Sequence, residues 1–68
     1  MGASRHLKAI FTDRKLKMEV VANTIGKPRQ SLINQMYRDT WKFAEVEEIA
    51  EKLGCDIVFI DRETGKRY

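Results

Sequence analysis

The chain contains one cysteine, one proline and one histidine among its 68 residues. A single cysteine cannot form an internal disulfide, so a disulfide-stabilised scaffold is excluded and a reducing cytosol is the expected setting. Cys55 and His6 also lack the companion side chains that a metal centre or a nucleophilic site needs. We therefore expect no metal, no cofactor and no enzymatic activity.

Long hydrophobic runs are lacking too. No apolar stretch approaches the roughly 20 residues of a membrane-spanning helix, and the start, MGASRHLK, has no apolar run like that of a signal peptide. The expectation is a cytoplasmic protein, associated with the nucleoid. At 68 residues the chain is near the size where one hydrophobic core is only marginally sufficient, which keeps self-association open.

Negative charge is scarce in the first part of the chain. Residues 1–42 carry nine Lys and Arg against three Asp and Glu, whereas residues 43–68 carry four against seven. This asymmetry is typical of a protein with one face that attracts polyanions, although an ordinary solvated surface gives the same counts. The clustered glutamates after residue 43 fit the solvated side of an amphipathic helix better than a pair of catalytic acids.

Apolar residues recur at helical spacing in four segments, so the fold class is predicted to be mainly α. The expected helices cover about 4–15, about 17–25, a segment that starts at Pro28, and about 43–53. Ser4 is the expected N-cap of the first, and Gly26 is expected to end the second in a left-handed conformation. The last helix is expected to bury the following side chains: Phe43, Val46, Ile49, Ala50 and Leu53.

The periodicity changes after Gly54. Residues 57–60 are four consecutive β-favouring apolar residues, followed by a turn around residues 63–65, which predicts a C-terminal β-strand and hairpin. A strand that is apolar on both faces needs a second covering surface, and a partner subunit can supply it. The residues expected to serve dimerisation are Ile57, Val58, Phe59 and Ile60. Residues 55–68 are placed in the same domain as residues 1–54.

The segment IGKPRQSLINQMYRD joins two of the expected helices across a short turn. Ala22 is small where the helices must approach, Gly26 supplies the turn, and Leu32 packs back under the preceding helix. Together they predict a helix-turn-helix over about 17–37. Arg29 and Gln30 then begin the second helix, whose N-terminal side chains meet base edges in the DNA major groove in such units. Arginine pairs with guanine and glutamine with adenine, each through two hydrogen bonds.

From about Leu7 to Gly54 the chain resembles the lambda-repressor/Cro-type (Xre-like) helix-turn-helix regulators. VVANTIGKPRQSLINQMYRD is similar to their helix-turn-helix core, and KFAEVEEIAEKLGC to the helix that follows. The closing DIVFIDRETGK resembles a small phage- and mobile-element-associated subgroup with a C-terminal strand. The expected architecture is thus a four-helix lambda-repressor-like domain with a C-terminal β-strand or hairpin used for dimerisation.

The resemblance implies two sets of DNA-contacting residues. The base-reading set is Arg29, Gln30, Ser31 and Asn34. The backbone set is Lys17, Lys27, Arg38, Thr40 and Lys42. The chain departs from the family pattern at Lys17-Met18, where Thr-Gln is common, and at Pro28, where a serine or threonine cap is frequent. Trp41 lies among the backbone residues and is interpreted first as a cover for the core, with its indole N–H as an alternative phosphate donor.

These residues predict a sequence-specific double-stranded DNA-binding regulator of transcription, acting as a repressor on a pseudo-palindromic operator as a homodimer. The alternative is a protein-interaction module, such as an antitoxin that holds a partner protein. The basic first part of the chain favours DNA, whereas the doubly apolar strand is compatible with a protein partner. The sequence leaves open whether that strand pairs within or between subunits.

Overall fold

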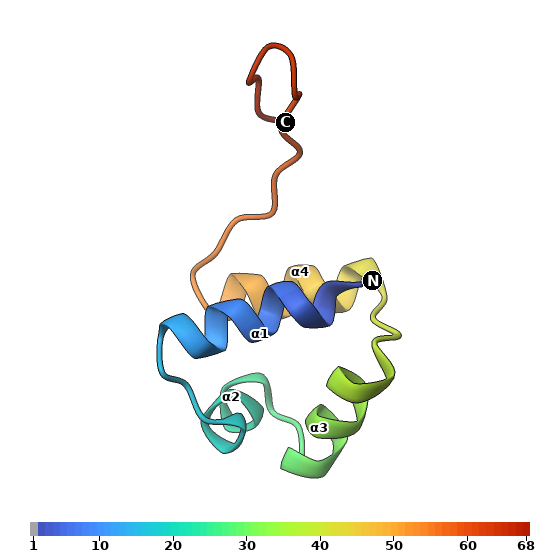
Figure 1. Cartoon of the computed structure of the whole chain (residues 1–68). Coiled ribbons are helices and arrows are strands. Elements are labelled where there is room, and N and C mark those ends of the chain that lie inside the picture. Colours follow the sequence, from blue (N-terminus) through green and yellow to red (C-terminus); the bar gives the residue numbers. More distant parts are fainter. Residues whose placement is uncertain (1) are drawn as a thin grey trace.

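A computed structural model describes residues 2–68 of the chain (Figure 1). The described residues form four helices, which are α1 (Ala3–Asp13), α2 (Met18–Ile25), α3 (Arg29–Arg38) and α4 (Phe43–Lys52). The mainly helical prediction is therefore confirmed. None of the helices in residues 2–68 has the length and apolar character needed to cross a bilayer.

The core lies where α1, α2, α3 and α4 meet, and it follows the apolar periodicity of the sequence. Its buried members are Leu7, Phe11, Val21, Ala22, Leu32 and Ile49. Leu32 of α3 is completely buried, with a relative exposure of 0%. Burial of a leucine side chain contributes about 2 kcal/mol to the free energy of folding. Its truncation to alanine lowers the stability by more than this, because a cavity remains. This packing fixes the orientation of α3 and therefore of the polar side chains on its outer side.

The turn between α2 and α3 forms as the sequence predicts. Gly26 ends α2 with φ of 72°, in the left-handed region where a side chain is strained. The N–H of Lys27 then donates to the carbonyl oxygen of Ala22 at 2.9 Å, which closes the end of α2. Pro28 is the N-cap of α3 and not its first helical residue, so α3 begins one position later than expected. The extended backbone of Pro28, with ψ of 142°, separates α2 from α3.

The prediction that Ser4 caps α1 is wrong. Helix α1 starts one residue earlier, at Ala3, with Gly2 as its N-cap. The capping group comes instead from the α3–α4 loop, because the N–H of Ser4 donates to Oδ1 of Asp39 at 3.0 Å. A carboxylate at a helix N-terminus satisfies a free N–H and interacts favourably with the helix dipole. The Ser4 hydroxyl has another partner, since it accepts a hydrogen bond from the indole nitrogen of Trp41 at 2.9 Å.

The expected burial of the α4 residues holds only in part. Ile49 and Ala50 are buried, and Val46 and Leu53 are half-buried, but Phe43 is 56% exposed. Phe43 is the first residue of α4, so it lies at the end of the helix beyond the packed centre. Lys42 is the N-cap, and its N–H donates to Oε1 of Glu45 at 2.9 Å. An ammonium group accepts no hydrogen bond, so Glu45 alone carries this cap.

The C-terminal β-strand is not seen among residues 2–68, which corrects that part of the predicted fold. Residues 55–68 form an extended arm that projects from the helices and folds back at its tip (Figure 1). The tip holds one isolated antiparallel bridge, between Ile60 and Arg67, and a turn in which Gly65 N–H donates to the Asp61 carbonyl at 2.8 Å. The expected turn thus forms without a strand. Two short segments paired only with each other are marginal in water. Of the apolar residues that favoured a strand, Ile57, Phe59 and Ile60 are exposed and Val58 is half-buried.

Candidate nucleic-acid interface

The four predicted base-reading residues, all from α3, lie exposed in the structure. They are Arg29, Gln30, Ser31 and Asn34. Leu32 is buried on the side of α3 opposite Gln30 and Asn34, which turns these two amides outward, while Arg29 and Ser31 are exposed in the first turn of the helix. Gln30 and Asn34 are one turn apart, and the Gln30 amide nitrogen donates to Oδ1 of Asn34 at 3.1 Å. The two amides are therefore oriented by each other before any ligand arrives.

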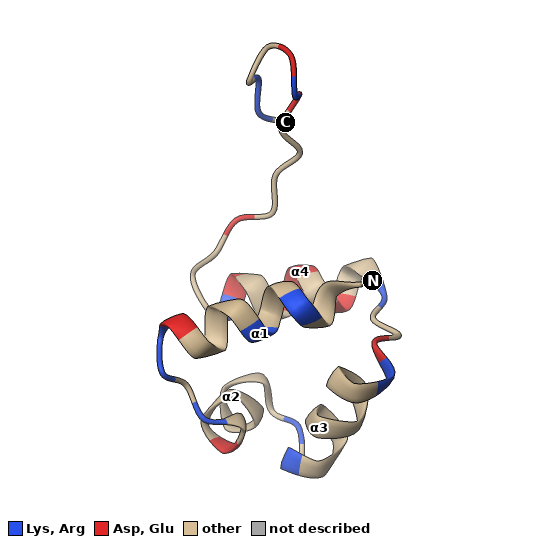
Figure 2. Cartoon of the chain, viewed as in Figure 1, with Lys and Arg blue, Asp and Glu red and all other residues tan. Residues whose placement is uncertain are grey.

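The N-terminus of α3 leaves its first N–H groups available. Its N-cap is Pro28, whose side chain has no acceptor atom for them. Free N–H groups and the positive end of the helix dipole favour an anion at such a position. Basic segments lie at both ends of α3 and acidic segments lie along α4, with further acidic segments on α1, α2, the α3–α4 loop and the C-terminal arm (Figure 2). The separation of charge expected from the sequence is thus preserved between these two helices.

A shallow hollow beside α3 connects parts of the two predicted sets. It has a volume of about 390 Å³ and is lined by Ser31, Asn34, Gln35, Arg38, Thr40 and Glu45. Two base-reading candidates and two backbone candidates therefore share one concave surface. Lys42 is exposed at the start of α4, close in sequence to Thr40. Lys17 is the exposed N-cap of α2.

Lys27, the remaining member of the predicted backbone set, is half-buried and contacts other side chains of the molecule. Its Nζ donates to Oε1 of Gln35 at 2.6 Å and lies 3.8 Å from Oε2 of Glu45. The same ammonium lies 5.8 Å from the centre of the Trp41 ring. These contacts join the α2–α3 turn to α3 and α4. Lys27 therefore acts as a brace, meaning a side chain that holds these three segments together.

Glu45 completes this network. Its Oε2 accepts a hydrogen bond from the Gln35 amide at 2.9 Å, and its Oε1 accepts from the Lys42 N–H. The pKa of Glu45 is lowered, first by the Lys42 N–H, then by the Gln35 amide and by the charge of Lys27. Gln35 and Glu45 organise the interface, yet the sequence analysis did not single them out. The contacts of Gln35 with Lys27 and with Glu45 span eight and ten positions, which are separations without a local signal, whereas the contact of Glu45 with the Lys42 N–H spans three.

Trp41 has the structural role that was its first interpretation. It is half-buried, packs against the core, and donates its indole N–H to the Ser4 hydroxyl. That donor is therefore engaged within the chain. Met18 likewise packs against the core, and its thioether provides no amide for a phosphate.

Within residues 2–68, no cluster of three or more His, Cys, Asp and Glu side chains is placed to hold a metal ion. The Cys55 thiol accepts a hydrogen bond from Nη2 of Arg14 at 3.2 Å, and Arg14 also donates to the Leu53 carbonyl oxygen. Arg14 thus joins the end of α1 to the end of α4. Comparison with protein-family models, curated proteins and solved structures gives no match to this chain.

Proposed function

We propose that the chain is a sequence-specific double-stranded DNA-binding protein that regulates transcription as a repressor. The observation that carries the proposal is the outward-facing first turn of α3, with Arg29, Gln30 and Ser31 exposed on a helix anchored by Leu32. These side chains have the donors and acceptors that read guanine and adenine edges in the major groove. The α2–turn–α3 unit would present them as the second helix of a helix-turn-helix does.

The backbone contacts proposed for this mode come from exposed groups around α3. Lys17, Arg38, Thr40 and Lys42 fulfil that condition, whereas Lys27 is half-buried and its ammonium already contacts Gln35 and Glu45. The proposed backbone set therefore has three cations in each protomer. Phosphate contacts of this kind fix the orientation of the protein on the duplex, while the base contacts supply sequence preference.

The proposal includes a homodimer joined through the C-terminal arm, residues 55–68. Phe59, Ile60 and Tyr68 expose more than half of their side chains there, which is costly for an isolated chain in water. Two copies joined by their arms would place two α3 helices on half-sites about 34 Å apart. Repression then follows from occupancy of a promoter, and the working location is the nucleoid.

Selection from a random duplex library, followed by gel shifts at two salt concentrations, tests the proposal. A palindromic consensus is expected, together with affinity that falls by about 10³ for a fourfold rise in salt if a dimer makes six phosphate contacts. Failure to enrich any sequence, with no duplex binding at low salt, would contradict it.

The second candidate is a protein-interaction module, for which the same exposed arm is the supporting observation. An antitoxin that holds a toxin would use the apolar residues of the arm on a different chain. The two candidates are distinguished by the gel shift, because this one requires no affinity for duplex DNA.

A further inference from the structure

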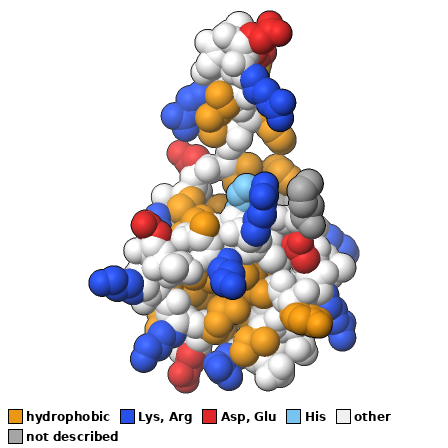
Figure 3. All heavy atoms as spheres, in the orientation of Figure 1, with side chains coloured by type: hydrophobic (Ala, Val, Ile, Leu, Met, Phe, Trp, Pro, Cys, Tyr) orange, Lys and Arg blue, Asp and Glu red, His pale blue; other side chains and the backbone are white. Residues whose placement is uncertain are grey.

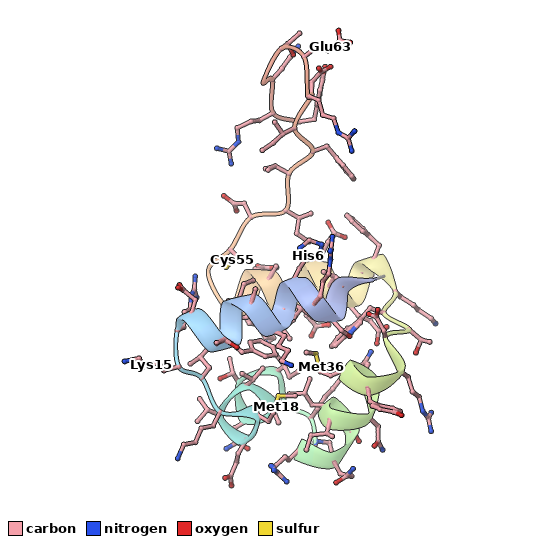
Figure 4. All side chains as sticks on the ribbon, viewed as in Figure 1. His6, Lys15, Met18, Met36, Cys55 and Glu63 are labelled. Atoms are coloured by element: carbon pink, nitrogen blue, oxygen red, sulfur yellow. The ribbon has the colours of Figure 1, made fainter. Side chains whose placement is uncertain are left out.

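A groove between α1 and α3, here called the α1–α3 groove, is separate from the surfaces considered above. Its volume is about 530 Å³, and its apolar floor is formed by Phe11, Leu16, Met18, Ile33 and Met36. Figure 4 shows Met18 and Met36 in the space framed by α1, α2 and α3. Methionine side chains are flexible and polarizable, which suits a surface that adapts to an apolar ligand.

The charged side chains that line the groove all have the same sign. They are Arg5, Lys8 and Lys15, and no Asp or Glu is among the described lining residues. Figure 3 shows hydrophobic side chains exposed below α1 with Lys and Arg side chains around them. Lys15 has a left-handed backbone with φ of 56°, which turns the chain back just after α1. An apolar floor with a cationic rim is complementary to an amphipathic anion.

The spacing of the cations indicates an elongated ligand. Arg5 and Lys8 are one turn apart on α1, and Lys15 follows just beyond its end. With a rise of 1.5 Å per residue, the helical part of this row, from Arg5 to the end of α1 at Asp13, extends over about 12 Å, or about two turns, and Lys15 lies beyond it. A single carboxylate would meet one of these cations, whereas acidic residues spaced along a helix would meet several. We propose that the α1–α3 groove binds an acidic, amphipathic helix of a partner protein.

The proposed mode is the insertion of an apolar helix face into a groove, with charge pairs at its rim. Tyr37, which also lines the groove, is 91% exposed and offers a large amphipathic surface to the incoming helix. The lining residues from α3 are Ile33, Met36 and Tyr37. None of the four base-reading candidates belongs to the described lining. The partner helix would contact α3 at Ile33, Met36 and Tyr37, whereas Arg29, Gln30 and Ser31 lie in its first turn.

The test uses the full chain with isotope-labelled methionine methyl groups and a synthetic helical peptide. The peptide has about 14 residues, with leucine along one face and glutamate on both flanks, which gives about four turns. Saturable shifts of the Met18 and Met36 methyl signals are expected. The double substitution Arg5→Glu/Lys8→Glu should weaken binding about tenfold or more, and so should replacing the glutamates of the peptide with lysine. Lys52→Glu, an exposed charge reversal on α4, is the matched control and should leave the affinity unchanged.

Tyr37→Ser is a second variant that changes no charge, and it should not disturb the fold because the Tyr37 side chain is almost fully exposed. This substitution should also weaken binding of the peptide.

The proposal would be overturned if the methyl signals did not shift at about millimolar peptide, or if the lysine peptide bound as tightly as the glutamate peptide. So would tighter binding of dodecanoate than of the peptide, which would identify a small amphiphile as the ligand. If the methyl signals changed when the chain alone was diluted, the groove would be the contact with a second copy of the chain. If they changed on addition of duplex DNA, the groove would belong to the DNA interface. These results leave the operator selection unaffected, so the two proposals fail independently.

Discussion

The amide nitrogen of Gln30 lies 3.1 Å from the side-chain oxygen of Asn34, one turn further along α3. Both side chains are exposed, and both belong to the set proposed to read bases. Their hydrogen bond restricts the rotamers of each before DNA binds, so less conformational entropy is lost on binding. The two residues should therefore act as a pair.

A double-mutant cycle measures this pairing. Gln30→Ala and Asn34→Ala should each weaken binding to a selected operator by about 1–3 kcal/mol. The double variant should lose less than the sum, with a coupling of about 0.5 kcal/mol or more, because either single change already removes their mutual contact. Gel-shift titrations give the four affinities. Thr24→Ala is the control, since the Thr24 hydroxyl bonds within α2, and it should combine additively with Gln30→Ala. Additivity within the Gln30–Asn34 pair would mean that the two amides act separately.

Arg29 is proposed to read one base pair. Arg29→Ala should cost about 1–3 kcal/mol on the preferred operator and should relax preference at a single position. Arg29→Lys keeps the charge but loses the two-pronged donor geometry, so it should also relax that preference while retaining more affinity. Repeating the library selection with each variant gives the base preference position by position. An equal loss on every sequence would assign Arg29 to a phosphate.

Lys27 and Arg38 provide a contrast between a brace and a phosphate contact. Arg38 is exposed at the end of α3, whereas Lys27 contacts Gln35, Glu45 and the Trp41 ring. Arg38→Gln should reduce the slope of log affinity against log salt by about 1 per protomer. Lys27→Gln should leave that slope nearly unchanged and should lower the free energy of unfolding by about 1 kcal/mol, as for one lost hydrogen bond. Salt titrations and thermal unfolding distinguish the two. A reduced salt slope for Lys27→Gln would return Lys27 to the backbone set.

How much of this interface could be predicted depends on how local each interaction is. Gly26, Ala22 and Leu32 were predicted correctly because a turn and a helix face leave their pattern within a few residues. The brace at Lys27 could not be predicted, since Gln35 and Glu45 follow 8 and 18 positions later. The position of that ammonium depends on contacts that form only when the folded chain brings Gln35 of α3 and Glu45 of α4 to the α2–α3 turn.

The start of α1 was missed for the same reason. Ser4 has the residue type of a cap, but the cap is Asp39, 35 positions away. A Cβ on Gly2 would lie 2.6 Å from Oδ1 of Asp39, so the small residue at that position allows the carboxylate to approach. The row formed by Arg5, Lys8 and Lys15 is different, because its spacing along one helix was visible in the sequence and could have been identified. The missing strand reflects a third cause, since β-favouring residues form a strand only where a neighbour completes the ladder.

Acid sensitivity follows from two carboxylates that join distant parts of the chain. The pKa of Asp39 is lowered below 3.8, chiefly by the Ser4 N–H, and that of Glu45 below 4.5, chiefly by the Lys42 N–H. A lowered pKa in the folded state means a contribution to stability that is present above the unfolded value and lost as pH falls through the folded value. The unfolding temperature should therefore stay nearly constant from neutral pH to about pH 5 and fall below about pH 4.5.

The variant Asp39→Asn/Glu45→Gln checks the cause. It should unfold at a lower temperature than the parent chain at neutral pH, and the difference should shrink as the pH falls below about 4.5. Calorimetry over a pH series gives both values. Glu51→Gln, an exposed change on α4, is the control and should follow the parent curve. A difference that stays constant at every pH would show that ionisation of these two groups is not responsible.

Phe59 tests the proposed dimer, because it lies 68% exposed on the C-terminal arm. The Phe59 N–H and carbonyl are paired with Tyr68 within the same arm, at 3.3 and 2.9 Å, so its backbone is already engaged and its side chain is what remains for a partner. Phe59→Glu should shift the chain from dimer to monomer in sedimentation equilibrium, since a carboxylate would have to leave water at the interface. Arg62→Glu, in the turn of the arm, is the matched control and should remain dimeric. An unchanged dimer with Phe59→Glu would place the interface elsewhere on the chain, while the base preference of α3 would stay as it was.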